Sequence, residues 1–154
     1  MSPGKSPETG EPVKRRYPQS PIASVAVCVL NGQRILVAKR ANPPSQGLWS
    51  VPGGVVELGE TIQDAARREI SEECGIVIDV GEIFTVENLI VPDEGGRIQF
   101  HYIITYLVAR YTSGEARPDS DALDVRWVTP QELNNLDMNP VIRRNMLKAF
   151  KIGG

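Results

Sequence analysis

The sequence has little of the chemistry that soft metal sites and disulfide-stabilised folds require. Among its 154 residues are two cysteines, Cys28 and Cys74, and one histidine, His101. Two cysteines make no disulfide framework and are typical of a reducing compartment. One histidine cannot build a zinc site of the usual nitrogen and sulfur kind. Any metal must therefore be held by oxygen ligands, which favours magnesium, manganese or calcium.

Neither the net charge nor the hydropathy indicates association with nucleic acid or a membrane. The 17 Lys and Arg residues and 19 Asp and Glu residues give a net charge of -2, so no overall basic field attracts either partner. An apolar run over residues 22–30 follows basic residues 14–16, as in a signal peptide, but it is short and "NGQR" follows it instead of a cleavage site. We interpret this run as a buried strand and expect a cytoplasmic protein. No other segment approaches the length of a membrane span.

Proline and composition divide the chain into a tail and one domain. Residues 1–20 are rich in proline, serine and glycine and cannot bury much surface. We therefore predict a flexible tail, of which Tyr17 can still dock on the domain. Residues 21–154 are enough for a single domain with a substantial core.

The domain is predicted to combine strands with two or three helices. Asn31-Gly32, between two β-rich runs, is a strong hairpin signal. Thr61 and Gly75 are typical of the two ends of a helix, and Thr129-Pro130 is typical of the start of another. The predicted strands span residues 22–30, 34–39, 76–91, 98–111 and 123–128, and a terminal helix follows Asn139-Pro140. The fold class is therefore α+β, with a mixed sheet sandwiched by helices.

The segment "REISEECG", residues 68–75, crowds carboxylates onto one side of the first predicted helix. Glu69, Glu72 and Glu73 have the spacing i, i+3, i+4, at which like charges repel one another. One interpretation is a solvated acidic face that neighbouring arginines partly neutralise. The other is a divalent-metal site, because clustered carboxylates become favourable once a dication lies among them. The surrounding sequence decides between the two.

The residues around this cluster follow a fixed spacing. In order they are Gly54, Glu60, Arg68, Glu69, Ile70, Glu72, Glu73, Gly75 and Ile76. This pattern resembles the signature of the Nudix hydrolases at every fixed position. The flanking segments "GLWSVPGG" and "DALDVRWVTPQEL" are similar to the strand that precedes the signature and to the late strand and helix of that family. The resemblance extends over most of residues 22–135.

Each position of the pattern also has a mechanical interpretation. Gly54 allows a tight loop whose backbone can come close to a metal or a phosphate. Glu60, just before the helix, can hold a ligand or Arg68, and Arg68 can orient a glutamate through a charge-assisted pair. Ile70 and Ile76 can anchor the helix to the sheet.

The resemblance implies an α/β/α sandwich with a mixed sheet, an antiparallel hairpin and a catalytic loop-helix-loop. It also implies a hydrolase that cleaves a nucleoside diphosphate linked to another group, with Mg²⁺ or Mn²⁺ as its cofactor. The implied metal ligands are Glu69, Glu72, Glu73 and the Gly54 carbonyl, helped by Glu57 or Glu60. The chain keeps every glutamate of the signature, which favours an enzyme over a nucleotide-binding regulator, and a scaffold that binds no metal is a more distant alternative.

The carboxylate that activates water varies within the family that this chain resembles. Glu69, Glu72 or Glu73 can take this role beside Arg68, and so can an acid from the loop after the sheet. The candidates in that loop are Glu115, which we rank first, Asp119 and Asp121. The alternative interpretation of these loop acids is a solvated turn.

A proline indicates the substrate. The family's ADP-ribose hydrolases typically carry a proline sixteen residues after the signature, and Pro92 lies sixteen residues after Ile76. ADP-ribose would give AMP and ribose 5-phosphate. Pro92 is also a turn proline that needs no substrate, and a nucleoside triphosphate pyrophosphatase is the alternative within the family. Arg40 can contact a phosphate or remain an exposed strand-end residue. ADP-ribose hydrolases that this chain resembles are often dimers, and in such a dimer residues 15–17 can contact the second subunit.

Overall fold

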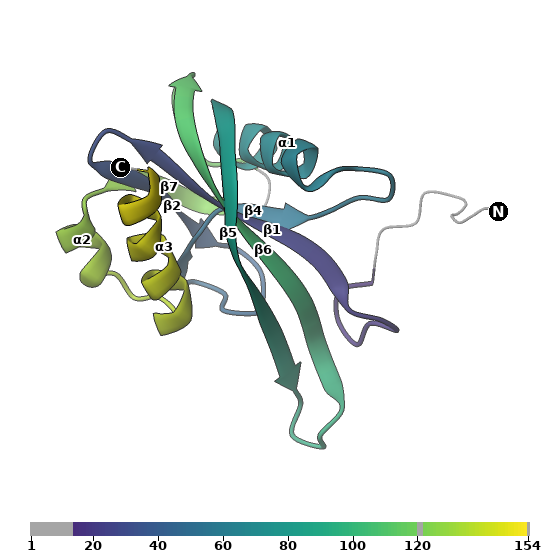
Figure 1. Cartoon of the computed structure of the whole chain (residues 1–154). Coiled ribbons are helices and arrows are strands. Elements are labelled where there is room, and N and C mark those ends of the chain that lie inside the picture. The colour runs from purple at the N-terminus through teal and green to yellow at the C-terminus, as the bar shows by residue number, and fades with distance from the viewer. Residues whose placement is uncertain (1–13, 120–121, 154) are drawn as a thin grey trace.

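A computed structural model of the chain describes residues 14–119 and 122–153. Its elements are β1 (Ile22–Asn31), β2 (Arg34–Arg40), β3 (Trp49–Ser50), β4 (Gly53–Val55), α1 (Ile62–Cys74), β5 (Val77–Pro92), β6 (Ile98–Ser113), β7 (Ala122–Val128), α2 (Pro130–Asn134) and α3 (Pro140–Gly153). Helix α1 covers one face of the sheet, and α2 and α3 lie on the other (Figure 1). The predicted α+β sandwich is confirmed. Residues 1–13 of the predicted tail and Asp121 lie outside the described residues.

The strands of the described part form one mixed sheet. Its order is β3-β2-β1-β6-β5, with β4 also paired to β1 and β7 to β2. Strands β1 and β6 are parallel, whereas β1 and β2 form the antiparallel hairpin predicted from Asn31-Gly32, with Leu30 opposite Ile35. None of the helices in the described ranges has the length and apolar character of a membrane span.

Strand β1 separates two hydrophobic cores. Alternate side chains of a strand point to opposite faces of the sheet, and both faces of β1 are covered by helices. Val27 is fully buried in the cluster that contains Ile70 of α1, whereas Cys28 is fully buried in the cluster that contains Met146 of α3. The apolar run at residues 22–30 is therefore a central strand, as predicted.

Helix α1 begins and ends where the sequence predicts. The Thr61 side chain accepts a hydrogen bond from the backbone N–H of Asp64 at 3.0 Å. Gly75, with φ of +75°, ends the helix in the left-handed conformation that glycine adopts at little cost. The buried stripe of the helix is Ala65, Ala66, Ile70 and Cys74. This stripe fixes the helix against the sheet and turns its carboxylates toward β4 and solvent.

Strands β5 and β6 form a long hairpin that extends beyond the body of the sheet (Figure 1). The pairing shifts between Val80 and Ile83, so the strand is irregular at Gly81. At the tip, Asp93 Oδ1 accepts hydrogen bonds from the backbone N–H groups of Gly95 and Arg97. The Tyr17 backbone N–H donates to the Gln99 carbonyl at 2.7 Å, so the end of the predicted tail docks on this hairpin.

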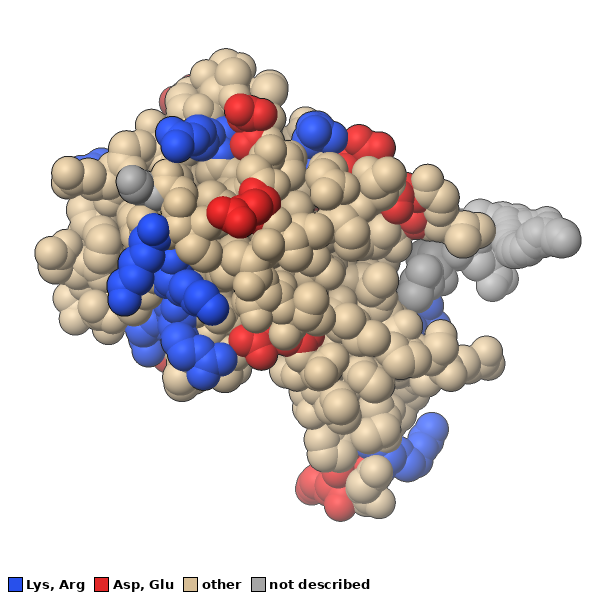
Figure 2. Space-filling model, viewed as in Figure 1, with Lys and Arg blue, Asp and Glu red and all other residues tan. Residues whose placement is uncertain are grey.

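Charges of both signs are distributed over the surface. Basic side chains gather over α3 on the face shown in Figure 2, and this helix carries Arg143, Arg144, Lys148 and Lys151. Acidic side chains lie beside them and at the tip of the hairpin (Figure 2). The molecule therefore has no uniform basic surface on this side.

Gly53 of β4 packs tightly against β1, which gives a stability prediction. A Cβ at this position would lie 1.9 Å from the Val25 carbonyl oxygen, a backbone atom that cannot rotate away. We expect Gly53→Ala to lower the free energy of unfolding by about 1–3 kcal/mol or more, as overpacking does. Urea unfolding would measure it. The control is Gly95→Ala, whose Cβ would meet its nearest atom, Asp93 Oδ1, at an ordinary 3.5 Å. Equal stability of the two variants would contradict the prediction.

Candidate active site

Arg68 connects helix α1 to the segment that precedes it. Its Nε donates to Glu60 Oε2 at 2.7 Å, and its Nη2 donates to Glu60 Oε1 at 2.9 Å. The same Nη2 also donates to the Val55 carbonyl of β4 at 2.9 Å. A planar guanidinium that meets a carboxylate through two parallel hydrogen bonds fixes both distance and orientation. The loop between β4 and α1 is therefore clamped at both of its ends.

The third nitrogen of Arg68 contacts the glutamate cluster. Nη1 lies 3.1 Å from Glu69 Oε1 and 3.1 Å from Glu72 Oε1. The Glu69 side chain is 17% exposed, whereas that of Glu72 is 53% exposed. Arg68 thus touches one glutamate that faces inward and one that faces solvent. This is the orienting contact that the sequence predicted for it.

Two of the carboxylates have pKa values shifted in opposite directions. The hydrogen bonds from Arg68 lower the pKa of Glu60. Burial raises the pKa of Glu69, and the positive charge of Arg68 only partly opposes that effect. Glu60 is therefore held as a carboxylate, while Glu69 has an environment in which a proton or a cation is favourable.

Glu69 and Glu73 reach back to the glycine pair of β4. A Cβ at Gly54 would lie 1.6 Å from Glu69 Oε2, so this carboxylate rests directly against the Gly54 backbone. The Gly53 backbone N–H donates to Glu73 Oε1 at 3.4 Å. The structure therefore brings together Gly54, Glu69 and Glu73, three of the residues predicted as metal ligands.

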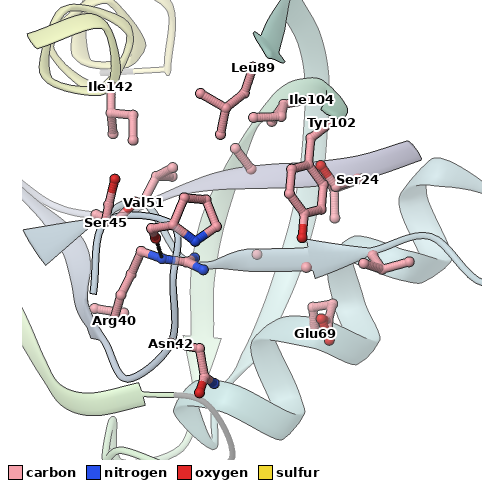
Figure 3. Close-up of a pocket in the computed structure, with 18 of the residues that line it drawn as sticks. Ser24, Arg40, Asn42, Ser45, Val51, Glu69, Leu89, Tyr102, Ile104 and Ile142 are labelled. Atoms are coloured by element: carbon pink, nitrogen blue, oxygen red, sulfur yellow. Dashed lines mark hydrogen bonds between the residues drawn. The ribbon is translucent and has the colours of Figure 1, made fainter. Parts of the chain in front are cut away.

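These residues form one end of a pocket of about 260 Å³ (Figure 3). Glu69 lies at the α1 end, and Leu89, Ile104 and Ile142 lie at the opposite, apolar end. The Tyr102 ring stands between these two ends (Figure 3). The wall opposite the hairpin comes from the loop that includes Arg40, Asn42, Pro43, Pro44 and Ser45. The pocket thus joins an acidic site to an apolar one.

The other residues predicted to belong to the site lie in different places. Arg40 lines the pocket, but its Nε donates to the Pro44 carbonyl at 2.7 Å, so it also shapes the pocket loop. Glu57 is 67% exposed and 3.7 Å from Arg68, and Glu60 is engaged by that arginine. Pro92 ends β5 opposite Ile98 on the projecting hairpin. Glu57, Glu60 and Pro92 are not among the residues that line this pocket.

The loop that carries Glu115 runs past the C-terminal end of α1. The backbone N–H of Arg117 donates to the Cys74 carbonyl at 3.0 Å, and that of Asp119 donates to the Glu73 carbonyl at 3.0 Å. Glu115 is exposed and does not line the pocket described above. Its predicted role as the base stays a prediction.

The donor atoms at the acidic end of the pocket are oxygens of a kind that suits a divalent metal. Within residues 14–119 and 122–153, no three His, Cys, Asp or Glu side chains converge closely enough to hold an ion as they stand. Glu69 and Glu73 nevertheless present carboxylate oxygens at the pocket, and burial of Glu69 makes a neighbouring cation favourable. Oxygen donors suit Mg²⁺ or Mn²⁺. For Glu72 to join them, its side chain has to leave Arg68.

The sequence did not indicate that Arg15 lines the pocket, nor which residues form its apolar end. Leu89 and Tyr102 are direct cross-strand partners on β5 and β6. Alternation in these two segments indicates which residues share a face, but which face lines a pocket depends on the twist and bend of the hairpin. Arg15 lies in the predicted tail, and nothing in its neighbours signals a contact with the pocket.

The comparisons with known proteins identify the family. The sequence model of the NUDIX domain matches residues 20–150. An ADP-ribose pyrophosphatase of Methanocaldococcus jannaschii is 32% identical over 137 residues, covering 89% of this chain and 77% of the relative. A putative 8-oxo-dGTP diphosphatase 2 of Mycobacterium tuberculosis is 36% identical over 123 residues, covering 77% of this chain and 81% of the relative. The chain therefore belongs to the NUDIX family, as its signature predicted.

Solved structures agree with this assignment. The crystal structure of a NUDIX hydrolase from Nitrosomonas europaea superposes with a TM-score of 0.67 at 26% identity, covering 84% of this chain and 72% of the other. A MutT NUDIX hydrolase from Burkholderia pseudomallei gives a TM-score of 0.68 over 88% of this chain and 100% of the other, at 24% identity. The fold and enzyme class are those of a Nudix hydrolase, a class that generally uses divalent metal ions.

The Glu60–Arg68 pair gives a pH-dependent prediction. Because the pKa of Glu60 lies below its ordinary 4.5, the pair stabilises the fold above that pH and loses its contribution as the pH falls through the lowered pKa. We expect Glu60→Gln to lower the free energy of unfolding at pH 7 by about 1.5–3 kcal/mol. The difference from wild type should shrink below pH 4.5 in urea unfolding series. Glu57→Gln is the control, with an expected change within about 0.5 kcal/mol. If the difference in free energy of unfolding between wild type and Glu60→Gln did not change with pH, the stabilising role of the ionised pair would be contradicted.

Gly54 gives a prediction about the metal. An added Cβ displaces the end of the Glu69 side chain, which can move, so the fold should survive Gly54→Ala. We expect Mn²⁺ affinity to fall about 10- to 100-fold, the usual cost of disturbing the support of a ligand. Calorimetric titration with Mn²⁺ measures it, and thermal melting checks the fold. Wild-type Mn²⁺ affinity in this variant would mean that Glu69 does not need its place beside Gly54.

Proposed function

We propose that this Nudix hydrolase cleaves the diphosphate linkage of ADP-ribose to give AMP and ribose 5-phosphate, with Mg²⁺ or Mn²⁺ as its cofactor. The observation that supports it is the composition of the pocket, which has Glu69 and Glu73 at one end and apolar side chains at the other. A nucleoside diphosphate linked to a sugar has the same division between anionic and less polar parts. The relative named as an ADP-ribose pyrophosphatase supports this choice of substrate.

The apolar end suits the nucleoside. Leu89, Tyr102 and Ile104 offer two aliphatic surfaces and one aromatic ring on neighbouring strands. A base packs favourably against an aromatic face whatever its hydrogen-bonding groups. The pocket loop of residues 42–45, which Arg40 holds through the Pro44 carbonyl, closes the other side.

The acidic end suits the diphosphate and its counter-ion. Glu69, Glu73 and the Gly54 backbone would hold the metal, together with Glu72 once it is released from Arg68. When bound, a divalent ion neutralises the diphosphate and lowers the pKa of its water. Hydrolysis forms one bond from water oxygen to phosphorus, breaks one bond from that phosphorus to the bridging oxygen, and requires an acceptor for the proton of the water.

Glu69 is the best-placed proton acceptor. It lines the pocket beside the proposed metal position, where the water of a bound ion would lie, whereas Glu60 is outside the pocket and held by two hydrogen bonds from Arg68. Arg68 acts as a positioning residue, because it contacts Glu69 and is itself fixed by Glu60. Glu72 is exposed and Glu115 lies outside the pocket, so both are weaker candidates.

A second substrate class has its own support. The relative named as a putative 8-oxo-dGTP diphosphatase is 36% identical to this chain. A nucleoside triphosphate presents the same combination of base and phosphates to the pocket. Products separate the two: AMP with ribose 5-phosphate marks the proposed reaction, and a nucleoside monophosphate with pyrophosphate marks the alternative. Incubation with Mg²⁺ and a panel of ADP-ribose, NADH, diadenosine polyphosphates, NTPs and 8-oxo-dGTP, followed by chromatography, decides between them.

The roles of the glutamates are tested by amide substitutions. We expect Glu69→Gln and Glu73→Gln each to lower kcat with ADP-ribose about 10²- to 10⁴-fold, the range of an acid–base contribution. Both variants should retain the wild-type fold, because each is isosteric. The control is Glu82→Gln on β5, an exposed glutamate outside the pocket. Near wild-type turnover in Glu69→Gln, with loss in Glu72→Gln, would transfer the role of the base to Glu72. Near wild-type turnover in both Glu69→Gln and Glu73→Gln would refute the proposed site.

A further inference from the structure

The segment that leads into β1, residues 14–20, is fastened to the tip of the β5–β6 hairpin by Tyr17. The Tyr17 hydroxyl donates to Asp93 Oδ2 at 2.7 Å, in addition to the backbone hydrogen bond to Gln99. The Arg97 guanidinium carbon lies 4.5 Å from the centre of the Tyr17 ring. Tyr17 also has φ of +53°, a left-handed conformation that is rare for a bulky residue and persists only where surrounding contacts fix it.

This anchor determines where Arg15 lies. Arg15, two residues before Tyr17, is exposed and lines the pocket. Its guanidinium makes no hydrogen bond or ion pair with any other residue in the described part of the chain. Arg16, its neighbour, instead lies 5.7 Å from the centre of the Phe100 ring. Adjacent arginines of one segment thus have different surroundings, and only Arg15 is presented to the pocket.

The other basic residues that line the described pocket, Lys39 and Arg40, each have a contact within the protein. The Arg40 Nε donates to the Pro44 carbonyl. The Lys39 Nζ lies 5.9 Å from the centre of the Trp49 ring. Arg15 differs from both, because within the described chain it makes no such hydrogen bond or ring contact and presents its whole guanidinium to a ligand.

Arg15 lines the same pocket as the acidic end. Arg15 and Glu69 both belong to the pocket wall, so their charges face the same space. A phosphate group near Glu69 would meet Arg15 as well, and a guanidinium binds phosphate through two hydrogen bonds at once. An arginine fixed by a neighbouring anchor loses less conformational entropy on binding than one on a free tail.

We propose that residues 14–20 form a strap, fastened by Tyr17 to Asp93 and Arg97, that holds Arg15 at the pocket as a phosphate-binding residue for the diphosphate of the substrate. This inference rests on the proposed function only for the identity of that substrate. Arg15 contacts the anion in the ground state as well as in the transition state, so its contribution is to binding. Tyr17 is a positioning residue that acts through Arg15.

Kinetics with matched variants test the strap. We expect Arg15→Gln to raise KM for ADP-ribose about 10- to 100-fold, the scale of a lost charge-assisted contact, with kcat changed less than about threefold. Arg16→Gln is the control, with KM within about twofold of wild type. Arg15→Lys should recover part of the loss, because lysine keeps the charge but not the two-pronged geometry.

Tyr17→Phe should raise KM less than Arg15→Gln does and have no further effect in the Arg15→Gln background. Wild-type KM in Arg15→Gln, or equal effects of Arg15→Gln and Arg16→Gln, would overturn the proposal for this substrate.

A labelling experiment tests the anion site without reference to the reaction. The full chain is treated with phenylglyoxal, which modifies accessible arginines, in the presence and absence of millimolar inorganic pyrophosphate, and each arginine is followed by peptide mass spectrometry. We expect pyrophosphate to slow labelling of Arg15 several-fold and to leave Arg16 unchanged. Protection of Arg15 in a protein that does not hydrolyse ADP-ribose would refute the proposed substrate and support the anion site. Equal labelling of Arg15 with and without pyrophosphate would refute the anion site, whatever the substrate.

Discussion

The Arg68 guanidinium holds together three pieces of chain, and the acidic end of the pocket depends on that connection. Glu60 comes from the loop before α1, the Val55 carbonyl from β4, and Glu69 from the helix itself. A flexible or monodentate cation would join these groups without fixing their angles, whereas the planar fork of arginine sets distance and direction together. With β4 and α1 held in this way, Glu69 lies against Gly54 and Glu73 lies near the Gly53 N–H. The small size of the two glycines is thus as necessary to the site as the charge of the glutamates.

The same connection separates the carboxylates electrostatically. Glu60 receives two hydrogen bonds from Arg68 and its pKa falls, while Glu69 is buried and its pKa rises. Carboxylates whose environments push their pKa values apart are suited to different tasks. Glu60 stabilises the loop and the helix, and Glu69 is left with a charge that a cation or a proton can compensate. The crowding of glutamates that looks unfavourable in the sequence is therefore eased by Arg68, which contacts Glu60, Glu69 and Glu72, while Glu73 accepts from the Gly53 N–H.

The sequence predicted what depends on neighbours in the chain and missed what depends on distant ones. Asn31-Gly32, Thr61 and Gly75 are local turn and cap signals, and each lies where it was expected. The spacing from Gly54 to Ile76 is also local, so it revealed the family and the clamp by Arg68. Pro92 was chosen by counting along the chain; it ends β5 opposite Ile98 and is not among the residues that line the pocket, so its role stays a prediction. Leu89 and Tyr102 could not be chosen at all, because their place beside the pocket follows from the register and course of a long hairpin.

This division between local and distant determinants explains why the family is clear from the sequence while the substrate is not. The acidic end is built from one continuous stretch, so it is retained as a unit wherever the signature is. The apolar end is assembled from β5, β6, the pocket loop and Ile142 of α3, which are far apart in the chain. Its geometry depends on contacts such as the 2.7 Å hydrogen bond from the buried Asn145 of α3 to Glu87 of β5. Small changes in any of these segments reshape the space around the base without touching the chemistry. Relatives of 32% and 36% identity can accordingly carry the names of different substrates on one fold.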